Sequence, residues 1–392
     1  MRAPQLLLKI LTRDQVISHR KRADALLNAV QALVTGAPLS LSCLGRALNP
    51  HGADKHGIKS VDELMRNQHL HRERAGVYRA LAHRVLCGVH RLIVQVDWSD
   101  SGRRDVRILR ATIALPGRSF VLWEQVYTEQ QYNSSVTHRA FVCELHSVLP
   151  QWCTHVLVVT DAGFRAPWFR LVESFGWHWL SRVRRTPKVH CDGRWTSVHE
   201  LYARATGRAQ ALGNVLLNKT NSLPVQMFLS KAPNPKRHGL RRNAEHYRAA
   251  KSHREPWLLA TSMGWSCTAA QVVKLYDTRM QIEQSFRDCK SPRFGYGLRY
   301  SNSKKPQRVA VLLLIAALAT FAQWLAGLVA EAQNWSRLFQ ANTETKRRVL
   351  SVVFIGRRMF NTERFTITPT MINQALQDLP KLVIQVPESA RF

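Results

Sequence analysis

The sequence predicts an α/β protein in which a mixed sheet follows an all-helical N-terminal region. Apolar residues recur at helical spacing through residues 1–85, as in DALLNAVQALV. Three β-rich runs follow from residue 88, and the turn sequence PGR separates the last two of them. Helix and strand patterns then alternate up to residue 185. Meandering strands followed by alternating helices and strands describe a mixed sheet.

The middle of the chain departs from this alternation. Residues 186–256 contain only short β-like runs among turns, such as NVLLNK and PVQMFLS, and predict a β-rich insertion. The β-like run WLLATS comes next. A strong helical pattern then extends from Ala269 to about Lys290.

Charge gives the first indication of a partner. The chain has 57 Lys and Arg against 26 Asp and Glu, a net charge of +31 that is spread along its whole length. This excess predicts a polyanionic partner and binding that weakens as salt rises, the alternative being a merely soluble basic protein. Residues 231–254 hold eight of these cations, including Arg241 and Arg242. They predict a basic loop that contacts DNA, unless the loop is simply solvated.

The N-terminal helices carry a second basic cluster. Ser60 stands three residues before Glu63, which predicts a capping box at a helix start. Cations near this position suit DNA binding, although a solvated helical face would have the same composition. The cluster consists of Lys55, His56, Lys59 and Arg66.

Cysteine usage and hydropathy indicate the compartment. The seven cysteines form no C-x-x-C pair, so we expect no disulfide framework and no zinc site, as in a reducing cytoplasm. The first residues contain too short an apolar run for a signal peptide. Residues 309–330 carry no charge and are long enough to span a bilayer, but an all-apolar helix can also be a core helix. Seven alanines and Gln323 make the segment only modestly hydrophobic, so we expect a core helix and no membrane.

Two aspartates stand at the ends of apolar strands. Asp97 follows Leu92–Val96, and Asp161 follows Val156–Val159 with one threonine between. A carboxylate at such a position either binds a ligand or caps a turn. Two of them in one sheet favour a metal site, because Mg²⁺ prefers carboxylate oxygens.

Helical geometry selects a third carboxylate. In a continuous helix over 269–290, the side chains of Tyr276, Arg279, Glu283 and Lys290 share one stripe roughly 60° wide at about 100° per residue. The acids Asp277 and Asp288 lie off this stripe. The pattern suits a helix that provides one metal ligand and lines bound DNA, and the alternative is an exposed Arg–Glu pair.

Three carboxylates of this kind fit phosphodiester chemistry. Two metal ions held by carboxylates generate a nucleophile at neutral pH and stabilise a leaving alkoxide, while Lys and Arg hold the phosphates. The sequence has no Walker A and no G-x-G-x-x-G motif, so we expect no nucleotide. Transesterification exchanges one phosphodiester for another and needs none.

Three motifs resemble one family. VDWSD at 96–100, VTDAGFRAPWF at 159–169 and Y-x-x-R-x-x-x-E-x6-K at 276–290 resemble bacterial DDE transposases of the IS-four family, most closely the transposase of insertion sequence IS-ten. The likeness extends to LGRALNPHGADKHGIKSVDELMRNQHLHRER and to SPRFGYGLRYS. It implies a ribonuclease-H-like catalytic core with a β insertion before the last catalytic helix.

The resemblance also implies roles for individual residues. Asp97, Asp161 and Glu283 would be catalytic metal ligands for two Mg²⁺ ions, with Mn²⁺ tolerated. Tyr276, Arg279 and Lys290 would contact the terminal phosphates, and Arg299 would be a further DNA contact. Trp257 stands where related enzymes place a base-flipping tryptophan, although a buried strand tryptophan is equally compatible.

The resemblance divides the chain into five expected regions. These are a helical DNA-binding domain (1–85), the first part of the catalytic core (86–185), the β-rich insertion with its basic loop (186–256), the second part of the core (257–335) and a C-terminal helical region (336–392).

The function implied is cut-and-paste transposition. Water nicks a strand at the element end, the 3′-OH attacks the opposite strand to form a hairpin, and water reopens it before strand transfer to target DNA. A homodimer would pair two inverted repeats in a synaptic complex, in the bacterial cytoplasm at the nucleoid. The alternatives are a stand-alone metal-dependent nuclease, a non-catalytic DNA-binding protein and a membrane protein anchored by 309–330.

Overall fold

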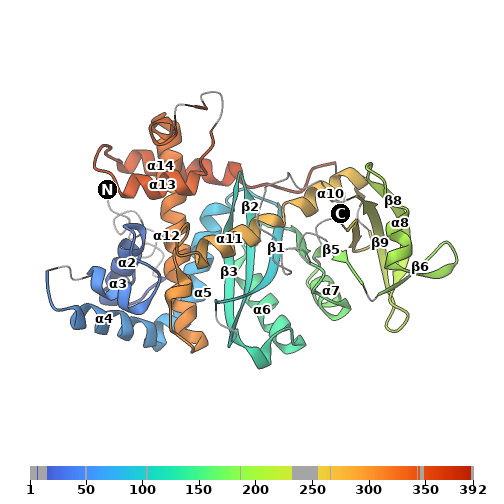
Figure 1. Cartoon of the computed structure of the whole chain (residues 1–392), viewed down its shortest axis with the longest axis horizontal. Helices are drawn as coiled ribbons and strands as arrows, with labels where there is room; N and C mark the ends of the chain where they lie inside the picture. The colour runs from blue at the N-terminus through green and yellow to red at the C-terminus, as the bar shows by residue number, and fades with distance from the viewer. Residues whose placement is uncertain are drawn as a thin grey trace. The chain divides into compact units, whose positions relative to one another are not determined.

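A computed structural model of the chain describes residues 7, 16–48, 51–102, 105–185, 187–231, 255–264, 266–341, 343–344 and 348–389 (Figure 1). The chain divides into two compact units. The first contains Met1–His90, Val96–Thr154 and Met280–Ile384, and the second contains Arg91–Gln95, His155–Arg279 and Gln385–Phe392. Most of the predicted basic loop 231–254, including the predicted DNA contacts Arg241 and Arg242, lies outside the described residues.

The described part of the N-terminal region, residues 16–48 and 51–85, contains four helices. Its helices are α2 (Arg20–Val34), α3 (Leu41–Leu48), α4 (Asp54–Arg66) and α5 (Gln68–Val85). Asn67 begins α5 by accepting a hydrogen bond from the N–H of Leu70 at 3.0 Å. These helices belong to the same compact unit as the helices that end the chain.

The predicted capping box at Ser60 is wrong. The helix α4 begins six residues earlier, at Asp54, so Ser60 lies in its interior. Packing overrides the local signal here. A Cβ at Gly57 would lie 2.0 Å from the carbonyl oxygen of Gly45, so two glycines let α3 and α4 approach closely. The residues before Ser60, which carry part of the basic cluster, are therefore the first part of α4.

Helix α12 (Pro306–Ala332) is the core of the first unit. It contains the apolar run 309–330, and among the described residues it is the one helix long and apolar enough to cross a membrane. Nearly all of that run is buried within the protein, as expected for a core helix. Figure 1 shows α2 and α13 (Val352–Phe360) beside it, and α4, α5 and α14 (Pro369–Asp378) also pack on it.

The first unit also holds the predicted meander. Its strands are the second half of β1 (Arg91–Asp100), β2 (Val106–Leu115) and β3 (Arg118–Thr128). β2 and β3 pair antiparallel around the predicted turn, where Gly117 has a φ of +85°. Helices α5, α6 (Ser135–Val148), α11 (Met280–Lys290) and α12 all contact β3, which explains why most residues on both faces of β3 are buried.

The second unit contains the strands of the predicted insertion. After the first half of β1, the strand order is β4 (His155–Thr160), β5 (His178–Val183), β10 (Trp257–Thr261), β9 (Leu223–Ser230), β8 (Gln210–Leu217), β6 (Lys188–Cys191) and β7 (Arg194–Ser197). β4 and β5 are parallel, joined through α7 (Ala166–Glu173). The pairs β5·β10, β10·β9, β9·β8, β8·β6 and β6·β7 are antiparallel. The short helix α8 (Val198–Ala203) follows β7. The predicted β-rich insertion is thus a sheet extension.

The predicted continuous helix over 269–290 is wrong at one point. It is two helices, α10 (Ala269–Asp277) and α11, with a break at Thr278 and Arg279. The Thr278 hydroxyl donates to the Leu275 carbonyl at 2.7 Å, and the Arg279 N–H donates to the Tyr276 carbonyl at 3.0 Å. These short-range bonds tighten the last turn. The Gln95 amide then donates to the Thr278 carbonyl at 2.6 Å. Tyr276 and Glu283 therefore lie on two different helices, and the continuous stripe predicted for Tyr276, Arg279, Glu283 and Lys290 is interrupted at Arg279.

The close crossing of α12 and α13 gives a stability prediction. A Cβ at Gly356 would lie 1.8 Å from the Gln323 carbonyl oxygen, and one at Gly327 would lie 2.1 Å from the Val352 carbonyl oxygen. We expect Gly356→Ala to lower the free energy of unfolding by about 1–3 kcal/mol, because the helices must separate. Denaturant unfolding measures this. Gly207→Ala is the control, since a Cβ there meets nothing within 4 Å. Equal midpoints for the two variants would contradict the close crossing.

Candidate active site

Asp97 lies on β1, immediately after the five buried residues Leu92–Val96. Its side chain is half-buried, and its Oδ1 accepts a hydrogen bond from the N–H of Trp98 at 2.8 Å. The Trp98 indole N–H points to Nε2 of His138 at 3.3 Å, and the ring packs edge-on against Tyr132. The backbone at Asp97 is therefore held by a neighbouring aromatic cluster as well as by the sheet.

Lys290 fastens the end of α11 to the end of β1. Its Nζ donates to the Ser99 hydroxyl at 2.9 Å and lies 3.5 Å from Oδ1 of Asp100. Burial alone would raise the pKa of the Asp100 carboxyl. The charge of Lys290 and a hydrogen bond from the N–H of Gly102 outweigh burial and hold that pKa below its ordinary value. The predicted phosphate contact Lys290 thus also has an internal partner.

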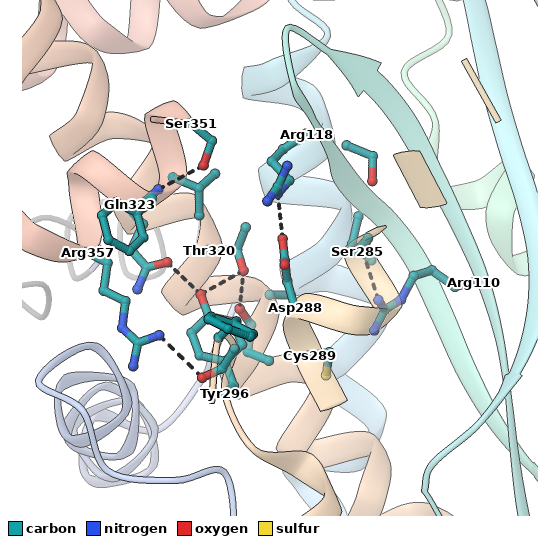
Figure 2. A pocket seen from close by; sticks show the side chains of 18 of the residues that line it. Arg110, Arg118, Ser285, Asp288, Cys289, Tyr296, Thr320, Gln323, Ser351 and Arg357 are labelled. Carbon is teal, nitrogen blue, oxygen red and sulfur yellow. Dashed lines mark hydrogen bonds and ion pairs between the residues drawn. The ribbon is translucent and has the colours of Figure 1, made fainter. Parts of the chain in front are cut away.

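Glu283 lies in the first turn of α11, and its side chain is exposed. The helix that carries it is held against the sheet by a buried ion pair. Arg110 on β2 and Glu124 on β3 are directly opposite each other, 2.6 Å apart, and their side chains are 2% and 1% exposed. Arg110 also donates to the Ser285 hydroxyl at 2.8 Å (Figure 2). The position of Glu283 therefore depends on charges buried in the sheet.

This pair is fully surrounded by partners. The Tyr78 hydroxyl donates to Glu124 at 2.9 Å, and Arg74 donates to the Glu124 carbonyl at 2.9 Å. The guanidinium of Arg110 lies 4.4 Å from the centre of the Phe286 ring. A buried pair is retained only when its remaining donors and acceptors are satisfied in this way.

A second ion pair holds the same helix nearer its end. Arg118 donates to Asp288 at 2.6 Å, as Figure 2 shows, and the Ser119 hydroxyl donates to the Gln281 carbonyl at 3.2 Å. Burial raises the pKa of the Asp288 carboxyl, and the charge of Arg118 opposes this rise. Two arginines from neighbouring strands thus determine the placement of α11.

A cavity of about 90 Å³ lies on the far side of α11 (Figure 2). Ser285, Asp288 and Cys289 line it, and at 100° per residue these positions face away from Glu283. Inside it, the Tyr296 hydroxyl donates to Gln323 of α12 at 2.8 Å. The cavity therefore belongs to the packing between α11 and α12 and not to the face that carries the carboxylate.

Asp161 follows β4 in the second unit, as predicted. Its Oδ1 accepts a hydrogen bond from the N–H of Gly163 at 2.8 Å, and its carbonyl accepts one from the Ser181 hydroxyl at 2.9 Å. A Cβ at position 163 would lie 2.9 Å from that Oδ1. The glycine in the DAGF sequence thus allows the carboxylate to fold back over its own turn.

Two further predicted residues, Trp257 and Arg279, contact the predicted residue Tyr276. Tyr276 is only 4% exposed, and its ring meets Trp257 edge-on at 5.0 Å. The Arg279 guanidinium lies 5.8 Å from the same ring. Burial raises the pKa of Tyr276, the charges of Arg279 and Arg182 oppose the rise, and the charge of Asp161 adds to it. Trp257 is half-buried on β10.

The predicted residues are divided between the units. Asp97, Glu283 and Lys290 belong to the first, and Asp161, Trp257, Tyr276 and Arg279 belong to the second. Within the described ranges, no three His, Cys, Asp or Glu side chains form a group that could hold a metal ion. In donor chemistry, the three carboxylates fit Mg²⁺, which binds oxygen ligands.

The remaining predicted DNA contacts are on the surface. Lys55, His56, Lys59 and Arg66 are exposed on α4, and Arg299 is exposed after α11. Arg66 pairs with Asp62 at 3.0 Å, and Lys59 lies 3.9 Å from Glu63. Arg241 and Arg242 lie outside the residues that the structure describes.

Sequence reasoning missed the residues that hold α11. Arg110 and Glu124 each interrupt an apolar strand, in DVRILRATIAL and SFVLWEQVY. A charge at the centre of such a run, facing an opposite charge across a predicted hairpin, is a signal that could have found them.

The buried pair gives a second prediction. Arg110→Met keeps the side-chain volume but leaves Glu124 buried without its charge partner. We expect a loss of about 3–5 kcal/mol in the free energy of unfolding. Denaturant unfolding measures it. Arg107→Met is the matched control on the same strand, because its pair with Glu129 is exposed to water and contributes little. Similar losses in both variants would refute a special role for the buried pair.

Comparison with known families identifies the family of the chain. The chain matches the family described as the transposase DDE domain over residues 89–321, which is more than half of its 392 residues. This range contains Asp97, Asp161 and Glu283. No curated protein matches the chain. The chain therefore belongs to the transposase DDE domain family.

Proposed function

We propose that this transposase performs cut-and-paste transposition of an insertion sequence, with Asp97, Asp161 and Glu283 as its catalytic carboxylates. The family match over 89–321 carries the proposal, because it spans all three positions. The order of strands, helices, β insertion and Glu283 helix supports a ribonuclease-H-like core. The sequence Y-x-x-R-x-x-x-E-x6-K supports membership of the IS-four group, close to the IS-ten transposase.

The three carboxylates would hold two Mg²⁺ ions, or Mn²⁺ in their place. Such ions supply a nucleophile at neutral pH and stabilise the leaving alkoxide. The half-buried Asp97 lies on β1, and the half-buried Asp161 directly follows β4. Glu283 depends on α11 and on the arginines that anchor it. One such site can repeat phosphoryl transfer with different nucleophiles, first water and then a DNA 3′-OH.

The residues around the carboxylates would position DNA. Arg279 and Lys290 offer cationic donors to the phosphates at the cleaved end. Trp257, half-buried against Tyr276, would receive a displaced base while the strand end bends into a hairpin. Two protomers would pair two inverted repeats in the synaptic complex, at the nucleoid in the cytoplasm.

The carboxylates give the first test. We expect Asp97→Asn, Asp161→Asn and Glu283→Gln each to lower end cleavage by on the order of 10⁴-fold, as when one member of a catalytic unit is removed. The assay follows nicks, hairpins and strand-transfer products from a duplex that carries the element end, with Mg²⁺. Binding to the same duplex should persist. Asp277→Asn, an exposed acid at the end of α10, is the matched control and should cleave normally.

Two results would refute this function. Cleavage by any of the three variants at the rate of Asp277→Asn would remove that residue from the site. Cleavage without strand transfer on paired ends would indicate a stand-alone metal-dependent nuclease.

Trp257 gives a test of the hairpin step. Displacing a base costs a few kcal/mol. We therefore expect Trp257→Ala to leave the first nick intact and to slow hairpin formation about tenfold or more, with Trp257→Phe restoring part of the rate. Gel analysis of a single end separates the two steps. Trp195→Ala, at a half-buried tryptophan of β7, is the control. Equal loss of nicking and hairpin formation in Trp257→Ala would contradict a base-flipping role.

A further inference from the structure

An open groove lies in the first unit between α4 and the segment that leads into α12. It has a volume of about 780 Å³, and its walls include Arg66, Lys304, Lys305 and Arg308. We call this the α4–α12 groove. Met65 is its buried floor, and Tyr300, which is 56% exposed, stands at its edge.

The α4–α12 groove is strongly cationic. Its one lining carboxylate, Asp62, is shared by two arginines, with Arg308 at 2.6 Å and Arg66 at 3.0 Å. Lys304 and Lys305 are exposed and form no ion pair with any residue in the described ranges. Four cations against one acid leave an excess of three positive charges in one concave surface. The start of α12 adds the partial positive charge of a long helix at Lys305.

Contacts connect this surface to the end of β1. The aliphatic part of Arg299 packs closely on Gly102. A Cβ added at Gly102 would lie only 2.8 Å from the Cγ of Arg299. Lys290 contacts Ser99 and Asp100 on the same strand. Cations therefore continue from the strand that carries Asp97, past Arg299 and Tyr300, to Lys304 and Lys305.

We propose that the α4–α12 groove binds the phosphate backbone of duplex DNA beside the cleaved phosphodiester. The proposal rests on the proposed function for its substrate. Lysines on a concave wall offer point charges to phosphates and carry no base readout, so the contact is independent of sequence. Duplex DNA fits better than a single strand, because single-strand sites present several aromatic side chains for stacking and this groove has only Tyr300 exposed among its lining residues.

The test is the salt dependence of binding by the double variant Lys304→Gln, Lys305→Gln. Titration of a labelled duplex, with and without the element end, is repeated over a range of salt. We expect the slope of log affinity against log salt to fall by about 1 for each phosphate contact removed, equally for both duplexes. The control Lys21→Gln, Lys381→Gln removes the same charge from exposed lysines of the same unit outside the groove. It should keep the parent slope.

The outcomes separate this proposal from the catalytic one. A slope equal to that of the control variant would overturn the groove assignment, even if cleavage is normal. Competition by an unlabelled single strand as effective as that by the duplex would overturn the choice of duplex. A parent protein that binds with the expected slope but never cleaves would refute the catalytic function and leave the groove standing.

Discussion

Arg110 and Glu124 are two charges removed from water in the middle of a sheet, and the placement of α11, the helix that carries Glu283, depends on them. Burying either charge alone costs several kcal/mol, so each holds the other at a single position. Their direct pairing across β2 and β3 also determines the register of the hairpin. The remaining donors of Arg110 reach Ser285, two residues beyond Glu283. The buried Arg110–Glu124 pair thereby constrains the position of α11 and of the exposed Glu283 carboxylate on it.

The same logic explains which parts of the fold could be predicted. Apolar runs of strand length placed β1 and β4 correctly, because a buried strand needs continuous apolar sequence. Asp97 and Asp161 follow such runs and could be selected from sequence alone. The break at Thr278 could not, because it depends on an amide from Gln95, more than 180 residues earlier in the chain. Helix-like spacing continues through the break and hides it.

The prediction that a helix begins at Ser60 was wrong for a related reason. Ser60 and Glu63 have the spacing of a cap, and local chemistry alone would begin a helix there. The actual start at Asp54 depends on the close approach of Gly57 to Gly45, which lies on another helix. The Arg110 and Arg118 contacts to α11 are likewise invisible until β2, β3 and α11 are brought side by side. Local signals predict elements, and contacts between distant segments decide their limits.

The charge of the chain can now be divided into structural and surplus parts. Arginines form the interior contacts, at the buried Arg74 and Arg110 and at the half-buried Arg118, where a planar group with several donors can satisfy several acceptors at once. Lys304 and Lys305, by contrast, remain exposed on a concave wall. Even if each of the 26 acids were paired with one cation, 31 cations would be left over. By this charge count these cations have no carboxylate partner, and their mutual repulsion opposes a compact state until a polyanion screens it. DNA binding would therefore offset the repulsion among the 31 surplus cations, which the acids of the chain cannot offset.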